Sequence, residues 1–302
     1  MSDMPHPSPN PSPNPGPNLI RVSDPGDPRL EVYRDQKDAW LRAKHNPAAS
    51  GDVTGTGLPG GLFMAESELV VRELLASGFS PESVLISEAR LESMRDALEA
   101  LTPTVPVYVA PREVMKALAG FDLHRGVLAA GRRGAELDAF ELARRSSVMV
   151  VMEDLANHDN VGGIFRSVGV LVDPDRHGQP AVLLSPRCCD PLYRKALRVS
   201  IAQALRVPFA TLDPWRDGLR RLMGEGVRLV ALTPSSGARP LHEISRSAGE
   251  RIALLVGAEG PGLSPETLDL VPEHARIEQR AGADSLNVTV ACSIALHQIL
   301  AC

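Results

Sequence analysis

The sequence lacks the long apolar segments that a membrane protein needs. Its longest apolar runs, such as Val148 to Met152, are only long enough for a buried strand, whereas a transmembrane helix takes about 20 apolar residues. The amino terminus, Met1 to Pro5, also has no apolar core of the kind found in secretory signals. We therefore expect a cytoplasmic protein that does not associate with a membrane.

Patterns of cysteine and histidine that would hold a disulfide framework or a metal are equally missing. The chain has four cysteines, whose number and spacing suit neither a disulfide framework nor a zinc site: Cys188, Cys189, Cys292 and Cys302. Three further residues, His124, His158 and His297, are isolated histidines with no metal-ligand spacing between them. We expect reduced thiols, solvated or packed histidines, and no bound metal.

An excess of positive charge is absent too, because 32 Lys and Arg stand against 37 Asp and Glu, for a net charge of −5. Proteins that bind nucleic acid usually present a basic surface, so the composition argues mildly against such a partner. One segment differs from the rest, since Asp190 is the only acidic residue between Arg187 and Arg206. A local basic patch is therefore present, and the overall charge does not decide whether the protein binds nucleic acid.

What is present is enough chain for two domains, with 302 residues of which 43% are hydrophobic. Residues 1–28 hold nine prolines and few apolar side chains, so we predict a disordered tail there. Residues 29–131 alternate between helical and strand-like patterns, which is typical of a small α/β domain. Residues 132–146 are predicted to be a linker, and residues 147–302 form a second α/β unit.

This second unit is predicted to contain one open, mostly parallel sheet covered by helices on both faces. Its strands are expected where short β-branched and apolar runs occur: Val148 to Met152, Ala181 to Leu184, Val227 to Leu232, Ile252 to Val256 and Ala275 to Ile277. Helical spacing predicts a terminal helix after Asn287, which lies where an N-cap would lie.

Three stretches of the second unit hold residues that could carry chemistry: Asn157 to Ser167, Leu255 to Ser264, and Ser285 to Ala291. Asn160 is predicted to cap the helix of the first stretch. The glycines of the second stretch, at 257, 260 and 262, do not have the spacing of a dinucleotide-binding loop. They indicate a tight turn or a close approach of the backbone to a planar ligand. The third stretch, taken alone, is more typical of a capped core helix.

The carboxyl ends of the strands are where an open α/β sheet binds its ligand. We therefore expect Arg166, Glu259, Ser285 and Asn287 to be brought together at that edge. The alternative for Arg166 is a surface ion pair, with Glu259 as its structural partner.

Together, in this order, the three stretches resemble the motifs of the SpoU (TrmH) family of knotted RNA ribose methyltransferases. Pro191 to Ser200 is similar to the basic helix of that family. The resemblance covers residues 60–301. It implies a SPOUT-type trefoil knot within the mostly parallel sheet, a small α/β RNA-binding domain before it, and a homodimer. In the first domain, Ser67 and Arg125 replace the family's more usual Gly and Gln.

The resemblance also implies the site. S-adenosylmethionine would be bound by loops near Thr233, Gly257, Ile277 and Leu286. The implied active-site residues are Asn160, Arg166, Glu259, Ser285 and Asn287. This chain departs from the family pattern before the third stretch, where Ile277-Glu278-Gln279 replaces Ile-Pro-Met.

The function that the resemblance implies is methyl transfer from S-adenosylmethionine to a ribose 2′-hydroxyl of RNA. Ribosomal RNA is favoured because an RNA-binding domain precedes the knot. The alternatives are a tRNA 2′-O-methyltransferase and a non-catalytic RNA-binding protein that no longer binds the cofactor. Because a guanidinium has a pKa above ~12, we expect Arg166 to grip a phosphate rather than act as a base.

Residues expected to bind RNA lie in both units. In the first domain and linker they are His124, Arg125, Arg132 and Arg133. In the second unit they are Arg194, Lys195 and Arg198. The opposing hypothesis is that the first domain only supports the dimer, and that the second group alone grips the RNA.

Overall fold

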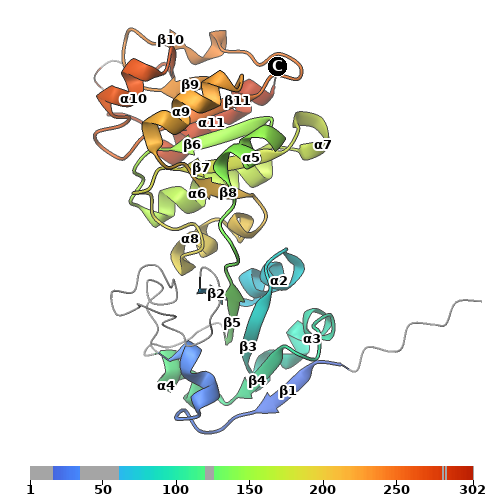
Figure 1. Ribbon diagram of the computed structural model, residues 1–302. Helices are drawn as coiled ribbons and strands as arrows, with labels where there is room; N and C mark the ends of the chain where they lie inside the picture. The colour runs from blue at the N-terminus through green and yellow to red at the C-terminus, as the bar shows by residue number, and fades with distance from the viewer. Residues whose placement is uncertain (1–15, 35–60, 120–125, 281, 283, 302) are drawn as a thin grey trace, which may run out of the picture.

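The computed structural model describes residues 16–34, 61–119, 126–280, 282 and 284–301, which form two sheets that follow one another along the chain. Figure 1 shows the first body in blue to green and the second in green to red. Part of the predicted tail is structured, because β1 (Asn18–Arg21) pairs in parallel with β4 (Pro106–Ala110). The prediction of disorder for residues 1–28 is therefore wrong over that strand, and residues 1–15 lie outside the described part.

The first sheet has five strands in the order β1-β4-β3-β5-β2. β1, β4 and β3 run parallel, while β5 is antiparallel to both β3 and β2. The remaining elements of this unit are β2 (Leu62–Glu66), β3 (Pro81–Ser87), β5 (Val127–Arg132), η1 (Pro28–Tyr33), α2 (Glu68–Ala76), η3 (Glu88–Arg90), α3 (Leu91–Glu99) and α4 (Arg112–Ala119). The expected alternation of helices and strands is confirmed.

The second sheet has seven strands, all paired in parallel, in the order β10-β12-β9-β11-β6-β7-β8. Every residue of β6, β7 and β11 is buried, which explains why these strands are continuous apolar runs. The strands are β6 (Val148–Met152), β7 (Pro180–Leu184), β8 (Phe209–Thr211), β9 (Arg228–Leu232), β10 (Arg239–Pro240), β11 (Ile252–Val256) and β12 (Glu273–Arg276).

Helices cover both faces of this sheet, as the sequence predicts. One core contains buried residues of α6 (His158–Leu171), α8 (Arg194–Val199) and α11 (Val288–Leu300). The other contains residues of α5 (Ala139–Arg145) and α9 (Trp215–Gly224), with α10 (Pro265–Leu270) packed beside it. The smaller elements are α7 (Pro174–His177), η4 (Gln203–Leu205) and η5 (Leu241–Glu243).

The position of α5 corrects the predicted linker. Ala139, Leu142 and Ala143 are buried against the second sheet, so residues 139–145 belong to that unit rather than to a connection over 132–146. Its sequence is rich in charge outside these three positions, which hid the helix. None of the helices in the described ranges has both the length and the apolar character that crossing a bilayer needs.

The helix α6 lies between α8 and α11 because two glycines allow its neighbours to approach. A Cβ on Gly162 would lie 2.7 Å from the backbone oxygen of Ala196 in α8. A Cβ on Gly163 would lie 2.6 Å from Cγ2 of Thr289 in α11. Real Cβ atoms do not come this close to their neighbours, so these positions require glycine.

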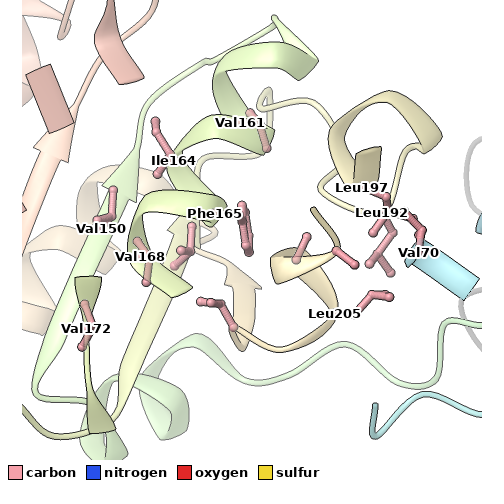
Figure 2. Packing of buried hydrophobic residues seen from close by; sticks show 14 of the residues in the cluster. Val70, Val150, Val161, Ile164, Phe165, Val168, Val172, Leu192, Leu197 and Leu205 are labelled. Carbon is pink, nitrogen blue, oxygen red and sulfur yellow. The ribbon is translucent and has the colours of Figure 1, made fainter. Parts of the chain in front are cut away.

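The two units touch through α8 (Figure 1). Val70 of α2 packs in one cluster with Leu192, Leu197 and Leu205 of the second unit, as Figure 2 shows. Ion pairs flank this contact: Arg206 Nη2 lies 2.5 Å from Glu73 Oε2, and Arg133 Nη2 lies 2.8 Å from Asp190 Oδ1. The apolar core of the second unit therefore continues into the first.

Candidate active site

Three of the predicted cofactor-binding residues stand at one edge of the second sheet. Thr233, Gly257 and Ile277 are the first residues after β9, β11 and β12, which are adjacent parallel strands. The Thr233 amide donates to the carbonyl of Ala275, at 3.0 Å, which holds the end of β9 against β12. Ile277 is half-buried and packs against the large apolar core. This is the carboxyl edge, where such sheets bind ligands.

The side chain of Asn160 connects the three stretches singled out in the sequence. Its Nδ2 donates to Oε1 of Glu259, in the loop after β11. Its Oδ1 accepts from Nδ2 of Asn287, before α11, at 2.9 Å. Asn160 itself is 6% exposed in the first turn of α6. The prediction that Asn160 caps this helix is wrong, because the cap is Asn157, whose Oδ1 accepts from the Asp159 amide at 2.9 Å.

Asn287 is confirmed as the N-cap of α11. Its Oδ1 accepts from the amides of Thr289 and Val290, at 2.9 and 3.4 Å. The same amide side chain thus begins the helix with its oxygen and contacts Asn160 with its nitrogen. A cap used in this way couples the start of α11 to the arrangement of the site.

Thr289 belongs to this group, although the sequence analysis missed it. Its hydroxyl lies 3.2 Å from both the backbone oxygen and the Oδ1 of Asn160, and it can donate to either. The sequence could have indicated it, because Thr289 has a hydroxyl in the first turn of the helix that the candidate residue Asn287 caps. We refer to Asn160, Glu259, Asn287 and Thr289 together as the amide cluster.

The structure does not connect Arg166, Ser285 or Leu286 to the amide cluster. Arg166 is exposed on α6, and its side chain makes no hydrogen bond or ion pair with another described residue. Among the described residues, Arg166 and Glu259 do not form the ion pair that was the alternative for them. The Glu259 carboxylate accepts a hydrogen bond from Asn160. Ser285 and Leu286 are exposed in the loop that leads into α11, with Leu286 37% exposed.

The loop after β11 is folded tightly upon itself, as its glycines predict. The amide of Gly262 donates to the carbonyl of Ala258 at 2.9 Å, and the two residues form an isolated antiparallel bridge. A Cβ on Gly257 would lie 2.1 Å from the carbonyl carbon of Gly262. Backbone, rather than side chain, therefore fills the space at the end of β11.

Glu278, where the chain departs from the family pattern, lies close to the side chains of an arginine and a histidine. Its carboxylate lies 3.9 Å from Nη2 of Arg276 in β12. It also lies 3.6 Å from Nδ1 of His242 in η5, an ion pair when that histidine is protonated. The substituted carboxylate thus has partners within the edge of the sheet.

The residues expected to bind RNA are not equally free to do so. Arg133 is largely buried, with its side chain 11% exposed in the ion pair with Asp190. Arg133 therefore helps to join the two units, and its contact with RNA stays a prediction. Arg132 pairs with Glu82, at 2.6 Å between Nε and Oε2, and keeps an exposed side chain. His124 and Arg125 lie outside the described residues.

The predicted basic residues of α8 lie on a surface next to α6. Lys195 is exposed and pairs with Asp159, at 2.7 Å between Nζ and Oδ2. Arg198 is exposed, and Arg194 is partly buried in the same helix. Because Asp159 precedes Asn160, this basic surface begins beside the amide cluster.

Cysteine chemistry does not take part in this arrangement. Burial raises the pKa of the Cys189 thiol to about 12 and also raises the pKa of the neighbouring Cys188. Both thiols stay protonated near neutral pH and are poor nucleophiles. No group of three or more His, Cys, Asp or Glu suited to a metal ion occurs in the described part of the chain.

Comparison with solved structures identifies the fold. The chain resembles the crystal structure of an AdoMet-bound rRNA methyltransferase from Sinorhizobium meliloti, with a TM-score of 0.71 and 21% identity, over 93% of this chain and 97% of that one. It also resembles a solved RNA 2′-O ribose methyltransferase, with a TM-score of 0.66 and 22% identity, over 92% and 97% of the two chains.

Comparison of sequences identifies the family. An uncharacterised tRNA/rRNA methyltransferase of Mycobacterium bovis is 40% identical over 281 residues, which is 92% of this chain and 90% of that protein. The model of the SpoU rRNA Methylase family matches residues 147–297, a range that contains β6 to β12, the amide cluster and most of α11. The chain therefore belongs to the SpoU rRNA Methylase family.

Proposed function

We propose that this protein transfers a methyl group from S-adenosylmethionine to a ribose 2′-hydroxyl of RNA. The observation that carries the proposal is the amide cluster, in which Asn160 bridges Glu259 and Asn287 at the carboxyl edge of a parallel sheet. Three sequence stretches far apart in the chain thereby meet at one place. Membership of the SpoU family supports RNA methylation, and the proposal adds the cofactor, the ribose hydroxyl and the class of RNA.

The residues at the sheet edge fit S-adenosylmethionine. Thr233, Gly257 and Ile277 offer backbone groups at the ends of adjacent strands, and Ile277 and Leu286 add apolar side chains suited to an adenine ring. The AdoMet named for the Sinorhizobium meliloti structure supports this cofactor. When bound, S-adenosylmethionine supplies an electrophilic methyl group on a sulfonium.

The side chains around this edge would align the ribose, whose 2′-hydroxyl proton would pass to solvent water as the oxygen takes the methyl group. Methyl transfer requires the attacking oxygen to be held in line, so orientation supplies much of the rate. Asn160, itself held by Asn287, fixes the exposed carboxylate of Glu259, which we assign to orientation of the reactants. The Ser285 hydroxyl would contact cofactor or ribose. Arg166 would hold the phosphate beside the target ribose.

Ribosomal RNA is the proposed substrate, because a separate α/β unit is docked beside the catalytic one and extends the surface available to a large RNA. Lys195 and Arg198 would contact phosphates near the site, and Arg132 would do so from the first unit. The family resemblance further supports a trefoil knot, a homodimer and a cytoplasmic protein, which we include in the proposal. The name of the Mycobacterium bovis relative keeps tRNA as the alternative substrate.

The test is to incubate the protein with methyl-labelled S-adenosylmethionine and either ribosomal RNA or tRNA. Mass spectrometry of nuclease digests should locate label in a 2′-O-methyl nucleotide of ribosomal RNA. Label in a base would overturn the ribose assignment, and label in tRNA alone would replace the substrate. If neither RNA is labelled and calorimetry detects no S-adenosylmethionine binding, the protein is a non-catalytic RNA-binding protein.

Asn160→Ala tests the amide cluster within this assay. The turnover rate should fall at least ~100-fold, because Glu259 and Asn287 lose their common partner. Asn157→Ala is the matched control, since it removes the cap of the same helix and should cost about 1 kcal/mol of stability while leaving turnover within a few-fold. Equal turnover in both variants would contradict the role of the cluster.

A further inference from the structure

A buried carboxylate that the proposed reaction does not use lies directly after β6. Glu153 is 5% exposed, and burying a charged side chain is costly unless hydrogen bonds compensate. Its carboxylate accepts three: from the Ser264 amide at 3.0 Å, the Ser264 hydroxyl at 2.7 Å and the Thr267 hydroxyl at 2.9 Å. The three donors come from the start of α10.

Glu153 also touches the other end of the loop that joins β11 to α10. Its backbone amide donates to the carbonyl of Val256, the last residue of β11, at 2.9 Å. The segment between Val256 and Ser264 is the glycine-containing loop, with Glu259 near its middle. The residue that follows β6 therefore fixes both ends of this loop, through its backbone at one end and its side chain at the other.

The Ser264 end of the loop is built around the carboxylate. Ser264 is the N-cap of α10, where its Oγ accepts from the Thr267 amide at 3.2 Å while its own hydroxyl donates to Glu153. Thr267 is 2% exposed, and its oxygen accepts from Nε1 of Trp215 at 3.0 Å. Hydrogen bonds thus link Trp215 of α9, Thr267 of α10 and Glu153, the residue after β6.

We propose that Glu153 is a positioning residue that holds the loop 257–263 in the shape that binds S-adenosylmethionine. Glu153 fixes the ends of the loop, and Asn160 fixes its middle through Glu259. With both attachments the backbone at Gly257 is held where it would meet the cofactor. The inference rests on the proposed function, because that function places S-adenosylmethionine beside Gly257.

The experiment uses Glu153→Gln in the full-length chain. An amide of the same size has one accepting oxygen and cannot satisfy three donors, so one or more of them loses its partner. We expect the Kd for S-adenosylmethionine, measured by calorimetry, to rise about tenfold or more. The KM for S-adenosylmethionine should rise in parallel while kcat at saturation stays within a few-fold. Simple loss of folded protein would instead lower kcat and leave KM unchanged.

Glu266→Gln is the matched control, because it neutralises an exposed carboxylate in the first turn of the same α10. It should leave Kd and KM within about twofold of the original chain. Ser264→Ala removes the hydroxyl donor and should weaken binding less than Glu153→Gln does. The double variant Glu153→Gln/Ser264→Ala should weaken binding by less than the product of the two single effects, since both changes disrupt the contact between Glu153 and Ser264.

Hydrogen exchange of the cofactor-free chain separates this inference from the proposed function. In Glu153→Gln, amides of residues 258–264 should exchange faster, and those of β7 should not. An unchanged Kd with unchanged loop exchange would overturn the inference. If Glu153→Gln does not fold, Ser264→Ala and Thr267→Val decide the question by the same two measurements. An original chain that does not bind S-adenosylmethionine would overturn the proposed cofactor, while the exchange data would still show whether Glu153 holds the loop.

Discussion

At Gly257 the backbone turns so closely past Gly262 that a single added carbon has no room. The Cβ of Gly257→Ala would lie 2.1 Å from a backbone carbon and 2.2 Å from a backbone nitrogen, neither of which can rotate away. We expect the variant to lose about 1–3 kcal/mol of stability and most of its affinity for S-adenosylmethionine. Thermal unfolding and calorimetry measure the two effects.

Gly224→Ala is the control for this substitution. Gly224 ends α9 and has open space where its Cβ would stand, so alanine there should leave the stability unchanged or raise it by up to ~1 kcal/mol. Equal melting temperatures for the two variants would show that the loop relaxes around Gly257.

His158 makes the stability of the folded protein depend on pH in the mildly acidic range. Burial lowers its pKa, Lys195 lowers it further, and Asp190 and Asp159 raise it in part. Its ring stacks on Tyr193, with centroids 4.0 Å apart. Because the pKa is lower in the folded chain than the ordinary value of ~6.5, protonation favours the unfolded state. The stabilising contribution is therefore complete above pH ~6.5 and falls as the pH drops below it.

His158→Phe keeps an aromatic ring against Tyr193 and removes the titrating group. Between pH 8 and pH 5.5 the variant should lose less stability than the original chain, because it has no imidazole at position 158 to take up a proton. The carboxylates of both proteins remain mostly ionised over that interval, so they contribute little to the difference. Denaturant melts at the two pH values provide the comparison. Identical losses would show that His158 does not contribute.

Among the elements, α11 begins at a residue with two separable tasks. Asn287→Ala removes both the cap and the contact with Asn160, so it should cost about 1 kcal/mol or more of stability and abolish most activity. Asn287→Ser retains a capping oxygen but has no amide nitrogen to donate. We expect near-normal stability with activity as low as in Asn287→Ala. A serine variant with restored turnover would show that only the cap matters.

The elements that the sequence predicted well are those whose pattern repeats. β6 and β11 are unbroken apolar runs, and the terminal helix has a capping residue before a helical apolar period, so each is recoverable from local signals. β1 is not, because its residues are weakly apolar within a proline-rich segment and are ordered by pairing with β4, some 85 residues later. No local pattern in the sequence indicates that β1 pairs with β4.

In the site, too, some features could be predicted from the sequence and others depend on tertiary contacts. The meeting of Asn160, Glu259 and Asn287 follows from their places after parallel strands, once the family motifs are recognised. The cap at Asn157 rather than Asn160 could not be predicted, because both are asparagines near the same helix start. Arg133 looked like a free cation in a Gly-Arg-Arg-Gly run, and only the tertiary structure supplies its partner Asp190.

For the molecule as a whole, the exposed face of α11 is the surface that we expect two copies to use in the proposed homodimer. Val290 and Ile294 are 46% and 40% exposed and lie one helical turn apart, so they form an apolar strip on one face. We expect the original chain to have twice the mass of one chain in light scattering. The double variant Val290→Lys/Ile294→Lys should be a monomer.

Leu137→Lys is the control for the dimer, because Leu137 is equally exposed, at 52%, but lies before α5. It should not change the measured mass. A monomeric original chain, or a double variant that stays dimeric, would remove α11 from the interface.

The contact of Val70 with Leu192 and Leu197 places the two units in a fixed relation. α8 contributes Leu197 to this contact and exposes Lys195, which pairs with Asp159 next to the amide cluster. If the first unit holds one feature of an RNA, the methylated nucleotide must lie at a set distance from that feature. The protein would then select its target nucleotide by its distance from the bound feature. An RNA with nucleotides inserted between that feature and the target would be methylated at a shifted position or not at all.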